Sequence, residues 1–187
     1  MGYIDKMEQY REMEVAILNS LNLNKINDAL QIIINTWKDE KDIYICGNGG
    51  SAATASHYVN DFNKGISERC GKKFRMHCLN DNVAILTAIA NDVCYDEVFR
   101  FQLREILREG DLVIGISGSG NSKNVIYALE YAKMQGVKTI AVTGYDGGRL
   151  REIADYNMHV PVENMQITED VHMFLGHMIT SVLSGLL

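Results

Sequence analysis

The sequence lacks the features that mark membrane proteins, secreted proteins and broad nucleic-acid binders. No uninterrupted apolar run reaches the roughly 18 residues that a membrane-spanning helix needs. The first residues, MGYIDKMEQYREME, mix charges throughout and contain no apolar stretch like that of a signal peptide. Lys and Arg number 18 against 24 Asp and Glu, a net charge of −6, whereas DNA and anionic membranes are bound through basic patches. We therefore expect neither nucleic acid nor a membrane as a partner.

Cysteine is scarce and shows no pattern that points to a metal or a disulfide. There is no CxxC pair of the kind that holds a metal, and without a secretory signal a disulfide framework is not expected. Burial as a small apolar side chain is the ordinary role for such residues. We expect reduced thiols in a cytoplasmic protein at Cys46, Cys70, Cys78 and Cys94.

Proline is nearly absent, and so are linkers and internal repeats. The single proline, Pro161, lies late, and no Pro/Gly-rich or low-complexity segment divides the chain. A length of 187 residues is typical of one compact domain with a small addition. We predict one domain over residues 1–187, with helices for packing and assembly at 1–40 and an α/β core at 41–187.

Hydrophobic periodicity indicates the fold class. The first forty residues show helical spacing twice, with a break at 22–24, which predicts a helical hairpin. Short apolar runs then alternate with helical stretches, which indicates βαβ crossovers and a mainly parallel sheet. We predict an α/β three-layer sandwich with a five-stranded, flavodoxin-like sheet. The expected strands are 42–46, 74–78, 111–117, 138–144 and 157–162. The expected helices of the core are 51–63, 83–90, 96–107, 122–135, 149–154 and 168–186.

Two strand-to-helix turns are rich in glycine and serine. They are CGNGGSAA at 46–53 and GISGSGNS at 115–122. Glycine lets backbone N–H groups point inward, a helix N-terminus adds partial positive charge, and hydroxyls donate to phosphate oxygens. Either turn alone is also explained as a tight turn with a helix cap. Two such turns after strands of one sheet favour a phosphate site, because ligands bind beyond the carboxyl ends of parallel strands.

Neither turn matches a nucleotide fingerprint. GNGGSA lacks the GxGxxG spacing, and no Gly-Lys-Ser/Thr sequence occurs. We therefore expect no nucleotide cofactor, and a phosphate monoester on a small molecule suits the turns better.

Two pairs of titratable residues are spaced for a helix face. His57 and Asp61 are four apart in the helix that opens at Ser51, and Glu169 and His177 are eight apart in the last helix. Carboxylates with imidazoles form proton-transfer sites or divalent-metal sites. For a His/Asp pair taken alone, a surface hydrogen bond is the commoner role. His172 is expected to point elsewhere on its helix, and His77 and His159 to be structural or surface residues.

Four segments together resemble a known family. They are CGNGGSAATASHYVNDF, ILTAIANDVCYDEVF, LVIGISGSGNSKNV and VTGYDGGRLREIADYNMHVPV. They are similar to the sugar-isomerase (SIS) domain and, more narrowly, to phosphoheptose isomerases, which convert sedoheptulose 7-phosphate to glycero-manno-heptose 7-phosphate. The resemblance covers nearly the whole chain and implies an SIS fold, a sugar-phosphate substrate, an aldose–ketose isomerase activity through an enediolate, and a homotetramer.

The resemblance also assigns substrate contacts. It implies that four hydroxyls hold the phosphate, within turns whose glycines are Gly49, Gly50 and Gly118, and that two further side chains contact sugar hydroxyls. The phosphate ligands are Ser51, Ser117, Ser119 and Ser122; the sugar ligands are Asn48 and Asp92.

By the same resemblance, Asp61 is the expected base and His177 the expected acid. The set His57, Asp61, Glu169 and His177 either positions the sugar or holds a divalent metal, with zinc expected. The family carries Glu where this chain has Asp61 and Gln where it has Glu169. These two changes either compensate around a metal or mark a different sugar phosphate. The alternative is a non-catalytic SIS protein that binds a sugar phosphate or a replication-initiator partner, and the presence of both His57 and His177 favours the enzyme.

Overall fold

Five parallel strands form the sheet at the centre of the molecule. The computed structural model describes residues 2–186, without the side chain of Leu186. The strand order is β2-β1-β3-β4-β5, which is the doubly wound arrangement expected from the sequence. The strands are β1 (Ile43–Gly47), β2 (Met76–Cys78), β3 (Leu112–Ser117), β4 (Lys138–Thr143) and β5 (Tyr156–His159). The predicted three-layer α/β class is confirmed.

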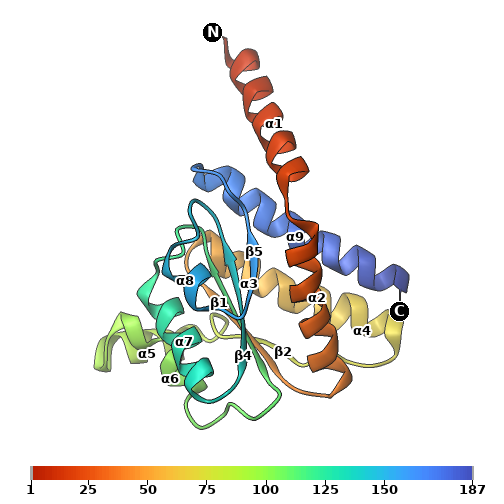
Figure 1. Ribbon diagram of the computed structural model, residues 1–187. Coiled ribbons are helices and arrows are strands. Elements are labelled where there is room, and N and C mark those ends of the chain that lie inside the picture. Colours follow the sequence, from red (N-terminus) through yellow and green to blue (C-terminus); the bar gives the residue numbers. More distant parts are fainter. Residues whose placement is uncertain (1, 187) are drawn as a thin grey trace.

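Helices cover both faces of this sheet (Figure 1). Alternate residues of each strand enter opposite cores: Ile114 and Ile116 of β3 pack in one, and Val113 packs in the other. The first face is covered by α2 (Leu23–Lys38), α3 (Gly50–Asn60) and α9 (Met165–Leu186). The second face is covered by α5 (Val83–Asp92), α6 (Arg100–Leu103), α7 (Lys123–Met134) and α8 (Gly148–Ile153). Burial on both faces explains why the strands are continuous apolar runs.

The helix after β1 differs from its prediction. It was expected to run to residue 63, but α3 ends at Asn60 and continues as a π-helical segment, η1 (Asp61–Ile66), followed by α4 (Ser67–Cys70). The wide turn lets Asn63 pair with the edge of β2: its Nδ2 donates to the Met76 carbonyl at 2.7 Å, and its Oδ1 accepts from the Met76 N–H at 3.0 Å. Such π segments recur at functional sites, and this one begins at the predicted base.

The expected helix at 96–107 is also broken. Only a 3-10 turn, η2 (Tyr95–Glu97), and the four-residue α6 form there. Glu105 has a φ of 63°, a left-handed conformation that a continuing α-helix does not allow. The chain therefore leaves the helix before the predicted end.

The two N-terminal helices are present, but α1 (Tyr3–Ser20) projects beyond the body of the molecule and does not lie alongside α2 (Figure 1). No residue of α1 is buried, and its contact with the body includes a 2.5 Å hydrogen bond from the Tyr10 hydroxyl to Asp170 of α9. Tyr10, Ile17 and Leu18 pack against the core, whereas apolar side chains nearer the start of α1, such as Tyr3 and Ile4, are exposed. Among the described residues, no helix is both long and apolar enough to cross a membrane.

Candidate active site

The two glycine–serine turns meet where the sheet reverses its strand order. The chain goes from β1 to the neighbouring β2 and then returns to the other side of β1 as β3. The helices that follow β1 and β3, α3 and α7, consequently pack on opposite faces of the sheet, which leaves a crevice beyond the carboxyl ends of these strands. Both predicted phosphate turns lie there, because each directly follows one of the two strands.

The first turn needs glycine for two different reasons. Gly49 has a φ of 57° and caps α3, a conformation that favours glycine. Gly47 is so close to the following helix that a Cβ there would overlap Ser51. Ser51 is buried in the first turn of α3. The glycines thus bring the N-terminus of α3 and its hydroxyl to the crevice.

The second turn is held by its own hydroxyls and by the loop before α8. The Ser117 and Ser122 Oγ atoms lie 3.1 Å apart, and Ser119 Oγ accepts from the Asn121 N–H at 3.2 Å. Gly120 has a φ of 66°, and a Cβ there would overlap the carbonyl of Gly147. This packing sets the shape of the turn before any ligand binds.

Both turns line one small cavity of about 120 Å³. Its volume suits an anionic group such as a phosphate better than a whole sugar phosphate. The cavity is lined by Asn48, Ser51, Ile116, Ser117, Gly118, Ser119, Ser122, Met165 and Glu169. The structure therefore brings all four predicted phosphate-binding serines together with Asn48 and Glu169.

Asn48 is fixed by two residues that sequence reasoning did not find. Its side-chain amide forms reciprocal 2.9 Å hydrogen bonds with Asn124 of α7, and the Tyr95 hydroxyl donates to its Oδ1 at 2.8 Å. Asn124 could have been found from its position two residues after Ser122, in the first turn of a helix. A side-chain amide that is buried there needs a hydrogen-bond partner. Asp92, in contrast, is exposed at the end of α5, accepts from the Asn91 amide, and does not line the cavity.

A second cluster lies further along the same two helices. His57 and His177 face each other with their Nε2 atoms 2.9 Å apart. Asp61 Oδ2 lies 3.4 Å from the Nε2 of His57 and 3.8 Å from that of His177. The side chain of Asp61 is 18% exposed, against 42% for His57 and 54% for His177. The three form a site that is open to solvent on the imidazole side.

Helices α3 and α9 run in the same direction, and this explains which residues meet. A Cβ at Gly50 would overlap the Glu169 carboxylate, and a Cβ at Gly176 would overlap the Tyr58 ring. The starts of both helices therefore pair with each other, as do their later turns. Glu169 and His177 are eight residues apart, about 12 Å along the helix. Glu169 consequently lies at the serine cavity, and the expected four-residue metal set is a set of three within this chain: His57, Asp61 and His177.

The donor set of this cluster fits a divalent metal. Two imidazole nitrogens and a carboxylate oxygen lie within 4.8 Å of one another. These are the atoms that zinc prefers, and three protein ligands leave a coordination position open. The two Nε2 atoms are 2.9 Å apart, which is hydrogen-bonding distance, so in this arrangement one of them is the donor and the other the acceptor.

The remaining histidines do not join the cluster. His172 is buried, burial lowers its pKa to about 4, and its carbonyl accepts from the Tyr58 hydroxyl at 2.5 Å. His77 is exposed and lies 2.8 Å from Asp42. His159 is half-buried, and its pKa is lowered by burial and by the charge of Arg151. His172 therefore points away from the cluster, and His77 and His159 lie outside it.

Comparisons with known proteins show the family and the fold. The family model described as the SIS domain matches residues 3–144. A phosphoheptose isomerase of Thermodesulfovibrio yellowstonii is 38% identical, with 98% of this chain and 92% of that protein covered. One from Aliarcobacter butzleri is 40% identical over 86% of this chain and 84% of its own length. The solved structure of phosphoheptose isomerase GmhA from Neisseria gonorrhoeae is similar with a TM-score of 0.89 at 27% identity, covering 98% of this chain and 100% of that chain.

Proposed function

The chain belongs to the SIS-domain family and, within it, to the phosphoheptose isomerases, and on this premise we propose that it interconverts sedoheptulose 7-phosphate and D-glycero-D-manno-heptose 7-phosphate. The observation that carries the proposal is that the serine cavity lies at the starts of α3 and α9, and that the His/Asp cluster lies at the later turns of the same two helices and the start of η1. A phosphate held at one end of this pair places the rest of a sugar along the helices toward the other. The alternative of a non-catalytic binding protein is not favoured, because the curated relatives are named as isomerases over nearly the full chain.

Substrate binding is assigned to the serine cavity. The hydroxyls of Ser51, Ser117, Ser119 and Ser122 would donate to phosphate oxygens, and the N-terminus of α3 adds a favourable dipole. Asn48, held rigid by Asn124 and Tyr95, would contact a sugar hydroxyl. Glu169 is a carboxylate and cannot form an ion pair with the phosphate. It would instead accept hydrogen bonds from sugar hydroxyls next to the phosphate. These contacts explain how a chain with a net charge of −6 binds an anion without a basic patch.

The proton-transfer steps are assigned to the second cluster. Asp61 would take a proton from C1 of the ketose and return it to C2 of the enediolate, which forms the aldose. His177 would donate a proton to the oxygen on C2 and accept one from the oxygen on C1, and it would assist ring opening. His57 lies within hydrogen-bonding distance of His177 and would hold the orientation of its ring. Asp61 Oδ2 faces both imidazoles, whereas its Oδ1 accepts from the Asn60 amide at 3.2 Å, which orients the carboxylate.

We propose that the same cluster holds zinc, through His57, Asp61 and His177. When bound, zinc would supply Lewis-acid polarisation of the substrate oxygens. The carboxylate of Asp61 has two oxygens, so one can be a ligand while the other stays available for a proton. Asp61 is shorter than the Glu that the family carries at this position. Its ability to serve both as a metal ligand and as a proton acceptor therefore depends on where its carboxylate lies.

We also propose a cytoplasmic homotetramer. The cysteines are all unpaired thiols, as expected for a reducing compartment. The exposed apolar residues of α1, including Tyr3, Ile4 and Met7, would be covered by another copy of the chain. Light scattering should give about four times the 21.0 kDa mass of one chain, and a monomer would contradict this assignment.

The experiment that tests the proposed activity is incubation of the pure protein with sedoheptulose 7-phosphate, followed by NMR detection of the aldose. We expect turnover by the wild-type protein and none by Asp61→Asn. Binding of the ketose without conversion by the wild type would overturn the isomerase proposal. Activity in a folded Asp61→Asn variant would overturn only the assignment of the base.

A further inference from the structure

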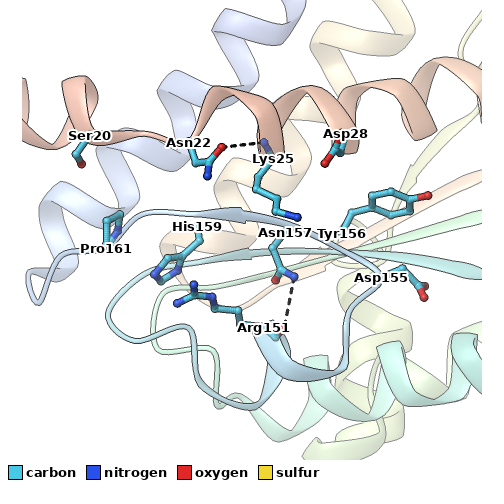
Figure 2. Close-up of a pocket in the computed structure, with 10 residues that line it drawn as sticks. All are labelled: Ser20, Asn22, Lys25, Asp28, Arg151, Asp155, Tyr156, Asn157, His159 and Pro161. Atoms are coloured by element: carbon cyan, nitrogen blue, oxygen red, sulfur yellow. Dashed lines mark hydrogen bonds between the residues drawn. The ribbon is translucent and has the colours of Figure 1, made fainter.

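A larger cavity of about 490 Å³ lies at the other end of the sheet, between α2, α8 and the edge strand β5 (Figure 2). It shares no residue with the serine cavity or the His/Asp cluster. Its volume falls in the usual range of small-molecule pockets. It is lined by Ser20, Asn22, Lys25, Asp28, Arg151, Asp155, Tyr156, Asn157, His159 and Pro161. The cavity is therefore a separate candidate site.

Two cationic side chains from different helices enter this cavity. Lys25 extends from α2 and Arg151 from α8, and Figure 2 shows both heads directed into the space between the helices. Within residues 2–186, neither forms an ion pair with a carboxylate; Arg151 donates one hydrogen bond, to the carbonyl of Asp146 at 3.1 Å. Two uncompensated cations that face one hollow repel each other, so a bound anion would stabilise the arrangement.

The acidic residues of the cavity do not cancel this charge. Asp155 is already used: it accepts from the backbone and hydroxyl of Thr139, both at 2.9 Å, and lies 3.6 Å from Lys133. Asp28 is exposed on α2, at the rim. A carboxylate at the rim repels a second anion but accepts hydrogen bonds from hydroxyls. The charges therefore divide the cavity into an anion-binding part and a hydroxyl-binding part.

Two further side chains offer unused polar atoms. His159 Nδ1 lies 3.0 Å from Thr143 Oγ1, which leaves its Nε2 for a ligand. Figure 2 shows the imidazole beside the Arg151 guanidinium. Asn157 donates through Nδ2 to the Arg151 carbonyl at 3.3 Å, whereas its buried Oδ1 has no donor among the described residues. A buried acceptor without a donor is costly, so this atom favours a ligand or water that donates to it.

We propose that this cavity binds a small organic phosphate that carries hydroxyl groups. Its phosphate lies between Lys25, Arg151 and His159, and its hydroxyls meet Asp28 and Asn157. The Lys and the Arg match the charge of a phosphate monoester, and with the His they offer donors to several of its oxygens, which suits a phosphate better than a single carboxylate. This site is distinct from the proposed isomerase site and does not depend on the proposed reaction.

The test uses glycerol 3-phosphate as the probe and two NMR reporters in the full-length protein. The imidazole signals of His159 report on this cavity, and the methyl signal of Met165 reports on the serine cavity that it lines. We expect glycerol 3-phosphate to shift the His159 signals in a saturable way and glycerol to leave them unmoved. The double variant Lys25→Met/Arg151→Met should weaken the binding seen at His159 at least about tenfold, because hydrogen bonds to charged groups are lost.

A matched control is offered by the same two helices. Lys38→Met/Arg149→Met removes the same charges from α2 and α8 outside the cavity and should leave the His159 titration unchanged. If the double variant does not fold, Lys25→Met alone tests the same contact on the exposed surface of α2. The proposal would be overturned if glycerol 3-phosphate did not shift the His159 signals, or if glycerol shifted them as well. It would also be overturned if the variants of Lys25 and Arg151 bound glycerol 3-phosphate as tightly as the wild-type protein. A shift at Met165 alone would leave the isomerase proposal standing and overturn this one.

Discussion

The two ends of the α3–α9 helix pair are built in different ways. At the first end, the phosphate turns use backbone conformation, buried hydroxyls and a helix N-terminus, and close packing sets their shape. At the second end, His57, Asp61 and His177 are side chains that meet across 120 residues of sequence and remain partly open to solvent. The first end is a preformed binding site, whereas the second can change its protonation or take a cation.

This difference separates binding from chemistry along one helix pair. Binding a phosphate requires a fixed arrangement of donors, and tight turns provide it at low entropic cost. Moving protons requires groups that can both take up and release a proton, and imidazoles and carboxylates are such groups. Substitutions at the two ends should therefore affect different kinetic constants.

The largest effect is expected at the chemical end. His177→Ala should lower kcat by about 10²–10⁴-fold, because a proton-transfer group is removed, and it should change KM much less. Steady-state kinetics with sedoheptulose 7-phosphate measures both constants. His77→Ala, an exposed histidine outside the site, is the matched control and should keep full activity. Equal losses in both variants would mean that the loss is not specific to the site, and a higher KM with an unchanged kcat in His177→Ala would assign this residue to binding.

The next effect concerns His172, which lies between the two ends on α9. Its folded pKa of about 4 is below the ordinary 6.5, because burial disfavours the charged imidazole. The unfolded chain therefore binds a proton as the pH falls through about 6.5, while the folded chain stays neutral until about 4. The free energy of unfolding should be fully retained above about pH 6.5 and should fall by up to about 3 kcal/mol as the pH approaches 4.

Urea unfolding at several pH values between about 7 and 4 measures this loss. A His172→Leu variant is expected to show a shallower dependence on pH across the same interval, whatever its stability at neutral pH. An unchanged slope in that variant would assign the acid sensitivity to other groups.

Zinc should distinguish the two ends directly. At a concentration about 100 times its Kd, zinc should stabilise the folded protein by about 2.7 kcal/mol, which thermal unfolding detects as a rise in Tm. His57→Ala should abolish this rise, whereas Glu169→Gln should keep it, because Glu169 lies at the serine cavity. Loss of the rise in Glu169→Gln would place this residue in the metal site and join the two ends.

The smallest of these effects is expected at the binding end. Ser119→Ala removes one hydroxyl from the phosphate cavity and should raise KM about tenfold, with little change in kcat, because other donors remain. Ser56→Ala on the exposed side of α3 is the control and should leave both constants unchanged. A fall in kcat with constant KM would show that Ser119 acts in the chemical step.

Much of the fold and the binding end could be predicted from local patterns. Both glycine–serine turns, the five strands and the parallel sheet follow from glycine spacing and apolar runs, which act over a few residues. The π segment at Asp61 and the early end of α6 were missed, because they depend on the pairing of Asn63 with β2 and on the conformation of Glu105. The partners of Asn48 were also missed, since Tyr95 and Asn124 come from other elements.

By itself, the sequence determined the sheet, the phosphate turns and the residue types able to move protons, because each of these depends on short-range periodicity or on side-chain chemistry. Only the tertiary structure decided how these residues are shared between the two ends. The parallel run of α3 and α9 places Glu169 at Gly50 and His177 at His57, so residues with similar chemistry serve different regions. The cavity formed by Lys25, Arg151 and His159 likewise exists only because α2 and α8 pack beside the edge strand. Such distances are set by packing between elements that are far apart in the chain.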